Sequence, residues 1–276
     1  MDENKVCGSY RCVFTDIEYG LLVDMIATRE KEDVIRWLNK LPDKDRINVV
    51  VMDMWKHYRS AVQEVLPDVP IVVDKFHVVQ MLNDALDDIR ISLRGSMTKD
   101  ERRNLRHDKW LMLRNKEDLN EKQKVELDRL FEVYPIFKEP YDLKEEFRNI
   151  YNKSINRRDA LTRYAKWKKK IPEDLTEYQK FVGTVARWYS EIFNYFDYNV
   201  TNAYTEAVNV LIKKEAATGR GYTFEVLRAK MIFGSKNRKP AKYIFNKPSS
   251  TPTGTYGFMT YWEDKRILVH GEGVVL

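Results

Sequence analysis

Two aspartates follow short apolar segments that are typical of buried strands. Asp53 comes directly after Ile47–Met52, and Asp74 comes directly after Ile71–Val73. Polar atoms just beyond the C-terminal ends of such strands lie where α/β proteins bind ligands, and carboxylate oxygen is the ligand that Mg²⁺ prefers. The alternative for either acid is a helix cap, because a helix is predicted after each strand.

A third carboxylate, Glu206, lies early in a predicted helix that runs from Asn202 to Lys214. Asn202 is the expected N-cap of this helix, and the side of the helix opposite Glu206 is apolar. Glu206 and Lys213 share one side, so the carboxylate could face a site while the lysine reaches a phosphate. The alternative is that Glu206 belongs to a solvated surface.

The elements that must position these acids alternate between strands and helices over the first ninety residues. Two apolar segments, Arg11–Thr15 and Leu21–Ala27, flank Gly20 and predict a β-hairpin. If Met1–Val6 is also a strand, the order is β-β-β-α-β-α-β, a mixed sheet with two right-handed crossovers. The helices predicted in this part are Glu32–Leu41, Trp55–Leu66 and His77 to about Leu93.

Strand patterns disappear after residue 93, where long amphipathic segments follow one another. We therefore expect an α/β protein whose mixed sheet is interrupted by an all-helical insertion. The expected segments are the first part of the core at 1–93, the insertion at 94–196, core helices at 197–235 and a tail at 236–276 with a short strand at Ile267–His270.

Composition narrows the class of protein. Of the 276 residues, 43% are hydrophobic, which is enough for a packed core and excludes a disordered chain. There is no run of eighteen apolar residues and no signal peptide, so we expect a cytoplasmic protein. The two cysteines, Cys7 and Cys12, cannot form a four-ligand zinc site. The net charge of +6 favours a polyanionic partner.

Positive charge is concentrated between Asn152 and Lys170, where eight basic residues accompany one acid, Asp159. Such a segment can bind DNA through its phosphates, without reading sequence; the alternative is a solvated helix face. The residues that we expect to contact DNA are Lys213, Arg157, Arg158, Lys168 and Lys169. Three nearby tryptophans, which could stack on bases, are more typical of a helical core: Trp110, Trp167 and Trp188.

Two blocks of sequence resemble bacterial insertion-sequence transposases of the ISL-three family. The first contains Val-Met-Asp53-Met-Trp-Lys-His-Tyr and then Ile-Val-Val-Asp74-Lys-Phe-His77. The second, Thr-Asn202-x-x-x-Glu206-x-x-Asn209, is similar to that family's Thr-Asn-Gly-x-x-Glu-Gly-Leu-Asn block, with alanines in place of two glycines. The resemblance covers roughly residues 1 to 235.

The resemblance implies an RNase H-like catalytic core in which three acids bind two Mg²⁺ ions, for which Mn²⁺ can substitute. Its topology assigns Asp53 and Glu206 as the second and third acids. For the first acid, Asp2 is our choice because Asp2-Glu3 aligns with the family's Gly-Ile-Asp-Glu strand. Asp16 is the runner-up, although an acid at a hairpin turn commonly serves the turn itself.

The same resemblance assigns a supporting role to Asp74 and His77, which look like an Asp-x-x-His signature of related transposases; the alternative is a hydrogen bond at the start of a helix. Family members usually carry an N-terminal zinc-binding and helix-turn-helix region, and no Cys-x-x-Cys pair occurs here. We therefore expect a catalytic fragment or an N-terminally truncated copy.

The predicted function is that of a DDE-type transposase, an enzyme of DNA transposition and recombination that cleaves transposon ends and joins them to target DNA. The expected partner is double-stranded DNA, with a homodimer in the synaptic complex and a place near the bacterial nucleoid. Two alternatives stay open. The first is a catalytically inactive DNA-binding remnant of a transposase. The second is an RNase H-like nuclease without strand transfer.

Overall fold

The structure, a computed structural model, describes residues 5–42, 44–92, 97–99, 102, 109–235, 266–270 and 274–275. The chain is a mixed α/β protein that divides into two compact units. The first contains residues 1–74 and 200–276, and the second contains residues 75–199. Across the described ranges, no helix is long and apolar enough to span a membrane.

The first unit begins with two hairpins. Strands β1 (Lys5–Val6) and β2 (Ser9–Tyr10) form a two-stranded sheet of their own. Strands β3 (Cys12–Asp16) and β4 (Leu21–Ile26) form the predicted hairpin, and Gly20 has the positive φ of 61° that its turn requires. Residues 1–4 lie outside the described residues, so most of the expected first strand does too.

Two parallel strands follow, each preceded by a helical crossover. Strands β5 (Ile47–Met52) and β6 (Ile71–Val73) have the predicted bounds and are almost wholly buried. The helical elements before and between them are α1 (Lys31–Lys40), η1 (Lys44–Arg46) and α2 (Lys56–Val65). Helices α1 and α2 pack against each other, because each has an apolar stripe to bury.

The predicted strand of the tail is confirmed, but its neighbours were not foreseen. Strand β7 (Arg266–His270) lies between β3 and β5, antiparallel to the first and parallel to the second. A short strand, β8 (Val274–Val275), pairs with β7 and with the end of β5. The resulting sheet has the order β4-β3-β7-β8-β5-β6.

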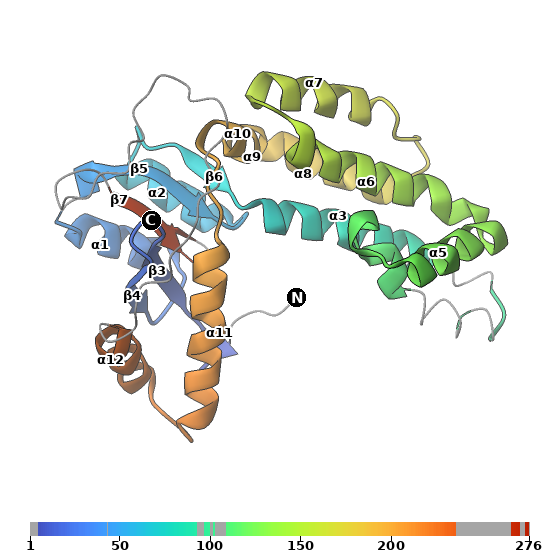
Figure 1. Cartoon of the computed structure of the whole chain (residues 1–276). Coiled ribbons are helices and arrows are strands. Elements are labelled where there is room, and N and C mark those ends of the chain that lie inside the picture. Colours follow the sequence, from blue (N-terminus) through green and yellow to red (C-terminus); the bar gives the residue numbers. More distant parts are fainter. Residues whose placement is uncertain are drawn as a thin grey trace. The chain divides into compact units, whose positions relative to one another are not determined.

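Helices α11 (Ala203–Thr218) and α12 (Phe224–Ser235) cover the face of the sheet opposite α1 (Figure 1). Alternation along β3 explains the two faces. Val13 packs with Val208 of α11 in one apolar cluster. The next residue, Phe14, points the other way and stacks on Trp37 of α1, with ring centroids 3.5 Å apart.

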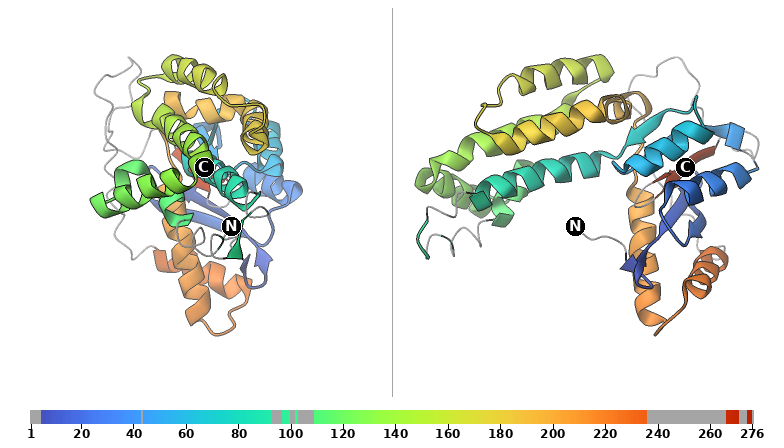
Figure 2. Two further views of the ribbon diagram at one scale, coloured as in Figure 1. Left: turned by 90° about the vertical axis from the view of Figure 1, so that its right-hand side faces the viewer. Right: turned by 180° about the vertical axis from the view of Figure 1, so that it is seen from behind.

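The second unit is helical throughout the part that is described. Helix α3 packs along both α6 and α8, and α7 packs on α6 (Figure 2). The expected insertion at 94–196 falls inside this unit, which already begins with α3. Its elements are α3 (Lys75–Ser92), a helical turn at 109–113, η3 (Lys116–Asp118), α5 (Glu121–Val133), η4 (Pro135–Phe137), α6 (Lys138–Lys153), α7 (Arg157–Lys168), α8 (Thr176–Arg187), α9 (Tyr189–Phe193) and α10 (Tyr195–Tyr198).

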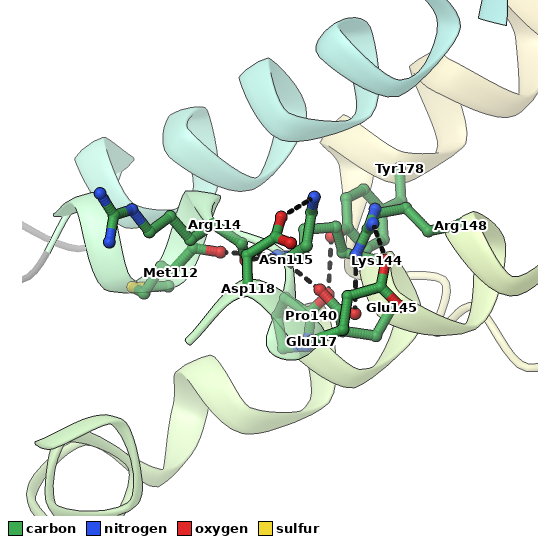
Figure 3. A network of polar contacts seen from close by, with 10 residues as sticks. All are labelled: Met112, Arg114, Asn115, Glu117, Asp118, Pro140, Lys144, Glu145, Arg148 and Tyr178. Carbon is green, nitrogen blue, oxygen red and sulfur yellow. Dashed lines mark hydrogen bonds and ion pairs between the residues drawn. The ribbon is translucent and has the colours of Figure 1, made fainter. Parts of the chain in front are cut away.

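A fully buried lysine of α6 holds the segment around the helical turn at 109–113 (Figure 3). The Nζ of Lys144 donates hydrogen bonds of 2.8 and 2.7 Å to the carbonyl oxygens of Met112 and Arg114. It also lies 2.8 Å from a carboxylate oxygen of Glu145 and over the ring of Tyr141. Burial lowers the pKa of Lys144 to about 8, and the two carbonyls use donors that the ammonium would otherwise leave unmatched.

Candidate functional site

The two predicted aspartates lie at the ends of neighbouring parallel strands. Val50 of β5 is opposite Ile71 of β6, and the carbonyl oxygen of Met52 accepts a hydrogen bond of 3.2 Å from the backbone N–H of Asp74. Asp53 follows Met52 directly, so both acids leave the sheet at the same edge. Asp74 is buried at 2% exposure and Asp53 is half-buried.

Glu206 is brought to Asp74 by the first turn of α11. A hydrogen bond of 2.8 Å between the buried hydroxyls of Thr205 and Thr15 holds this turn against β3. Glu206 is the next residue, and one of its carboxylate oxygens lies within 4.8 Å of a carboxylate oxygen of Asp74. The structure thus joins two of the acids that the sequence singled out, although they are far apart in the chain.

Two carboxylates this close repel each other, and the burial of Asp74 makes the repulsion harder to screen. The backbone N–H of Asn202 donates a hydrogen bond of 3.3 Å to Asp74 Oδ1. A divalent cation with its preference for hard oxygen ligands fits this donor set. The geometry therefore suits a metal centre built around Asp74 and Glu206.

The other predicted acids are placed differently. Among the described residues, Asp53 is not one of the side chains in the close group around Asp74. Asp2 lies outside the described residues. Asp16 serves the hairpin turn, as expected for an acid in that position, because its Oδ1 accepts hydrogen bonds of 3.0 Å from the backbone N–H groups of Glu18 and Tyr19.

His77 stands three residues after Asp74, in the first turn of α3 at the start of the second unit. Two intervening residues cannot span more than about 11 Å. The chain itself therefore keeps the imidazole in the neighbourhood of Asp74.

Asn202 is the residue whose role the sequence did not reveal. It occupies the N-cap position of α11, as predicted, but its side chain makes no capping hydrogen bond, so that part of the interpretation was wrong. Its backbone conformation explains the difference, with φ −86° and ψ 8° in place of the extended geometry of most N-caps. An asparagine before a helix is typical of a cap, and no signal in the sequence distinguishes the two cases.

Several basic residues of the second unit lie together on one face of α7. Arg157, Arg158, Lys166 and Lys169 line a shallow hollow of about 650 Å³ on this helix. Arg157 is held inside the unit, by hydrogen bonds of 2.8 Å to Asn194 and 2.7 Å to Asp197. The remaining cations of this face, with Lys168 beside them, extend from the helix toward solvent.

Two further predictions concern single side chains. Lys213 is half-buried on α11, two turns from Glu206 on the same side of the helix. Trp167 and Trp188 are core residues, as expected, with 2% and 3% exposure, whereas Trp110 is 68% exposed.

Two comparisons with known proteins give matches for this chain. The chain is 30% identical over 128 residues to the transposase for insertion sequence element IS1001 of Bordetella parapertussis, a match that covers 45% of this chain and 32% of that protein. The chain thus matches about a third of the length of this curated relative. No solved structure matches. A family model of the ISL-three DDE type, described as a transposase, matches residues 1–231. The chain therefore belongs to the ISL-three family of DDE transposases.

Proposed function

We propose that this chain carries the catalytic core of a transposase, which cleaves DNA at transposon ends and joins the 3′-hydroxyl to target DNA. The observation that carries the proposal is the pair of carboxylates of Asp74 and Glu206, with oxygens within 4.8 Å of each other. Asp53 follows the C-terminal end of the neighbouring strand, β5, at the same edge of the sheet. The chain belongs to a family of DDE transposases, which supports a role of these acids in DNA cleavage and joining.

The proposed core is RNase H-like. Its support is an antiparallel hairpin, β3–β4, followed by parallel strands β5 and β6 with helices between them. A strand that is antiparallel to β3 and parallel to β5 lies between the two halves. In this scheme Asp2 remains the proposed first acid, and Asp53 the second.

We assign the metal, Mg²⁺ or Mn²⁺, to Asp53, Glu206 and Asp2, with Asp74 as a further carboxylate and His77 in a supporting role. A bound divalent cation supplies polarisation of the phosphodiester and activation of the attacking oxygen. The protein's own contribution is to hold these carboxylates at the end of a rigid sheet, where their positions need no reorganisation.

DNA contacts are proposed for Lys213 and for the basic face of α7, through Arg157, Arg158, Lys168 and Lys169. On α7 the acid Asp159 is already engaged by Arg163, whose hydrogen bonds lower the pKa of that carboxyl. The positive charge of the face is therefore available to phosphates. A homodimer is the proposed assembly, because two transposon ends need two active sites.

The test is nicking of a supercoiled plasmid in Mn²⁺, combined with capture of a labelled oligonucleotide that carries a free 3′-hydroxyl. Asp74→Asn and Glu206→Gln should each lower nicking by more than about a hundredfold, because even outer-shell groups of metal sites contribute about 10–100-fold. Glu215→Gln is the matched control on α11, since Glu215 pairs with Lys230.

Each alternative has its own outcome. Nicks without joined products would indicate a nuclease. DNA binding with neither nicking nor heat of Mn²⁺ binding would indicate a remnant that is no longer an enzyme. Equal activity of the wild type and Glu206→Gln would contradict the proposed site.

A further inference from the structure

The side chain of Asn202 is fully buried and has no hydrogen-bond partner among the described residues. Its exposure is 0%, and neither Oδ1 nor Nδ2 takes part in a hydrogen bond. A buried carboxamide can donate two hydrogen bonds and accept two, and burial without any of them costs free energy. Such a group calls for an explanation, of which a ligand outside the polypeptide is one.

The main chain of Asn202 connects the two acids of the candidate metal centre. Its N–H donates to Asp74 Oδ1 at 3.3 Å, and its carbonyl oxygen accepts a hydrogen bond of 3.0 Å from the N–H of Glu206. Asn202 precedes Glu206 by four positions, which places both on one side of α11. The residue that carries the buried amide is therefore hydrogen-bonded through its main chain to both acids, inside the same unit of the protein.

A second buried amide lies further along this side of the helix. Asn209 is 8% exposed, and its Oδ1 also lacks a hydrogen bond among the described residues. It follows Glu206 by three residues, so that amide, carboxylate and amide succeed one another along one polar stripe. Only Asn202 has main-chain hydrogen bonds to both acids.

We propose that Asn202 is a ligand of the divalent cation that Asp74 and Glu206 hold. This assignment rests on the proposed metal centre and adds a residue to it. A carboxamide oxygen is a hard, neutral ligand that suits Mg²⁺ and Mn²⁺. Its neutrality matters here, because a third carboxylate beside Asp74 and Glu206 would add to their repulsion whenever the cation is absent. The cation supplies the partner that Asn202 Oδ1 lacks among the described residues.

The test is calorimetric titration of the full 276-residue chain with MnCl₂, together with its melting temperature without metal. Asn202→Leu should bind Mn²⁺ at least about tenfold more weakly. Its metal-free melting temperature should be unchanged or raised, because the variant buries an apolar group where an unmatched amide stood. Asn202→Asp keeps an oxygen ligand and should bind Mn²⁺ at least as tightly as the wild type.

A true helix cap of the same residue type is the matched control. The side chain of Asn120 accepts a hydrogen bond from Gln123 N–H in a capping box at the start of α5. Asn120→Leu should lower the melting temperature by about 3 °C and leave Mn²⁺ binding unchanged. A structural asparagine and a metal ligand thus differ in both readouts.

The outcomes separate this assignment from the function on which it rests. If the wild type binds no Mn²⁺, both the metal centre and the role of Asn202 are overturned. If the wild type binds and Asn202→Leu binds equally well, Asn202 is not a ligand and the metal centre stands. If Asn202→Leu does not fold, weaker Mn²⁺ binding by Asn202→Asp than by the wild type would overturn the assignment.

Discussion

Two buried polar side chains, one in each unit, show how differently the same fold treats its interior. In the second unit, the ammonium of Lys144 has two carbonyl oxygens and a carboxylate as partners (Figure 3). In the first unit, the equally buried amide of Asn202 has none among the described residues. Of these two groups, the one that holds segments of the fold together is matched within its unit, whereas the one proposed as a cation ligand is unmatched among the described residues.

The strongest test of this contrast is to remove the matched group. Lys144→Met keeps the length of the side chain and leaves the carbonyl oxygens of Met112 and Arg114, and the carboxylate of Glu145, without their shared partner. The free energy of unfolding at pH 7 should fall by about 3 kcal/mol, measured by urea denaturation. Lys138→Met, on the same helix, removes an exposed ion pair with Asp142 and a contact of the ammonium with the Phe131 ring at 5.7 Å, and should change the free energy of unfolding by less than about 0.5 kcal/mol.

The contrast would break if Lys144→Met were as stable as the wild type. The buried ammonium of Lys144 would then contribute nothing to stability, which is also what we expect of the side chain of Asn202 in the absence of metal.

Glycines give a second comparison of the units, in apolar packing. A Cβ on Gly219 would overlap the ring of Tyr222, which packs on the core of the first unit. Gly219→Ala should therefore cost about 2 kcal/mol of stability, as overpacking does. In the second unit, Gly183 lies inside α8 with only the tip of Arg187 near its Cβ position, at 3.7 Å.

Gly183→Ala should raise the free energy of unfolding by about 0.5–1 kcal/mol, because alanine favours the helix. Thermal denaturation of both variants checks the pair. Stabilisation by both substitutions would show that Tyr222 moves aside without cost.

The lowered pKa of Lys144 predicts how the free energy of unfolding depends on pH. Burial lowers its pKa to about 8 in the folded protein, from 10.5 in the unfolded chain. Between these values the unfolded chain binds more protons, so the contribution of Lys144 to the free energy of unfolding rises with pH, by about 1 kcal/mol per pH unit. Below pH 8 this contribution is constant.

The measurement is urea denaturation of the wild type and Lys144→Met from pH 7 to 10, since their difference cancels the other titrating groups. A difference that does not change with pH would mean that Lys144 keeps an ordinary pKa.

The smallest effect concerns the basic face of α7. Lys169 lies on the hollow of this face, whereas the neighbouring Lys170 pairs with Glu146 at 2.8 Å. Lys169→Gln should weaken binding of duplex DNA a few-fold and lower the slope of log affinity against log salt by about 1, the effect of one phosphate contact. Fluorescence anisotropy over a range of salt measures both. Lys170→Gln should change neither, and equal effects of the two variants would remove the role assigned to the hollow.

Local patterns predicted much of the first unit. The strands Ile47–Met52 and Ile71–Val73 have the predicted bounds, because a short apolar run between polar segments is a signal carried by the residues themselves. The turn role of Asp16 was equally local, since its Oδ1 accepts hydrogen bonds from the backbone of Glu18 and Tyr19, two and three residues further on. The insertion was expected to start at residue 94, whereas the second unit starts at residue 75, with α3. The spacing of apolar residues in α3 does not reveal that this helix packs on α6 and α8.

The sequence by itself determined which acids stand at strand ends, since strand, acid and helix follow one another along the chain. Only the tertiary structure brought Glu206 to Asp74, placed β7 between β3 and β5, and buried the amide of Asn202 without a partner in the part of the chain that is described. The reason is physical. Periodicity fixes which side of an element is apolar, whereas the partner of a strand edge or a buried polar atom is a distant segment, chosen by the packing of the whole unit.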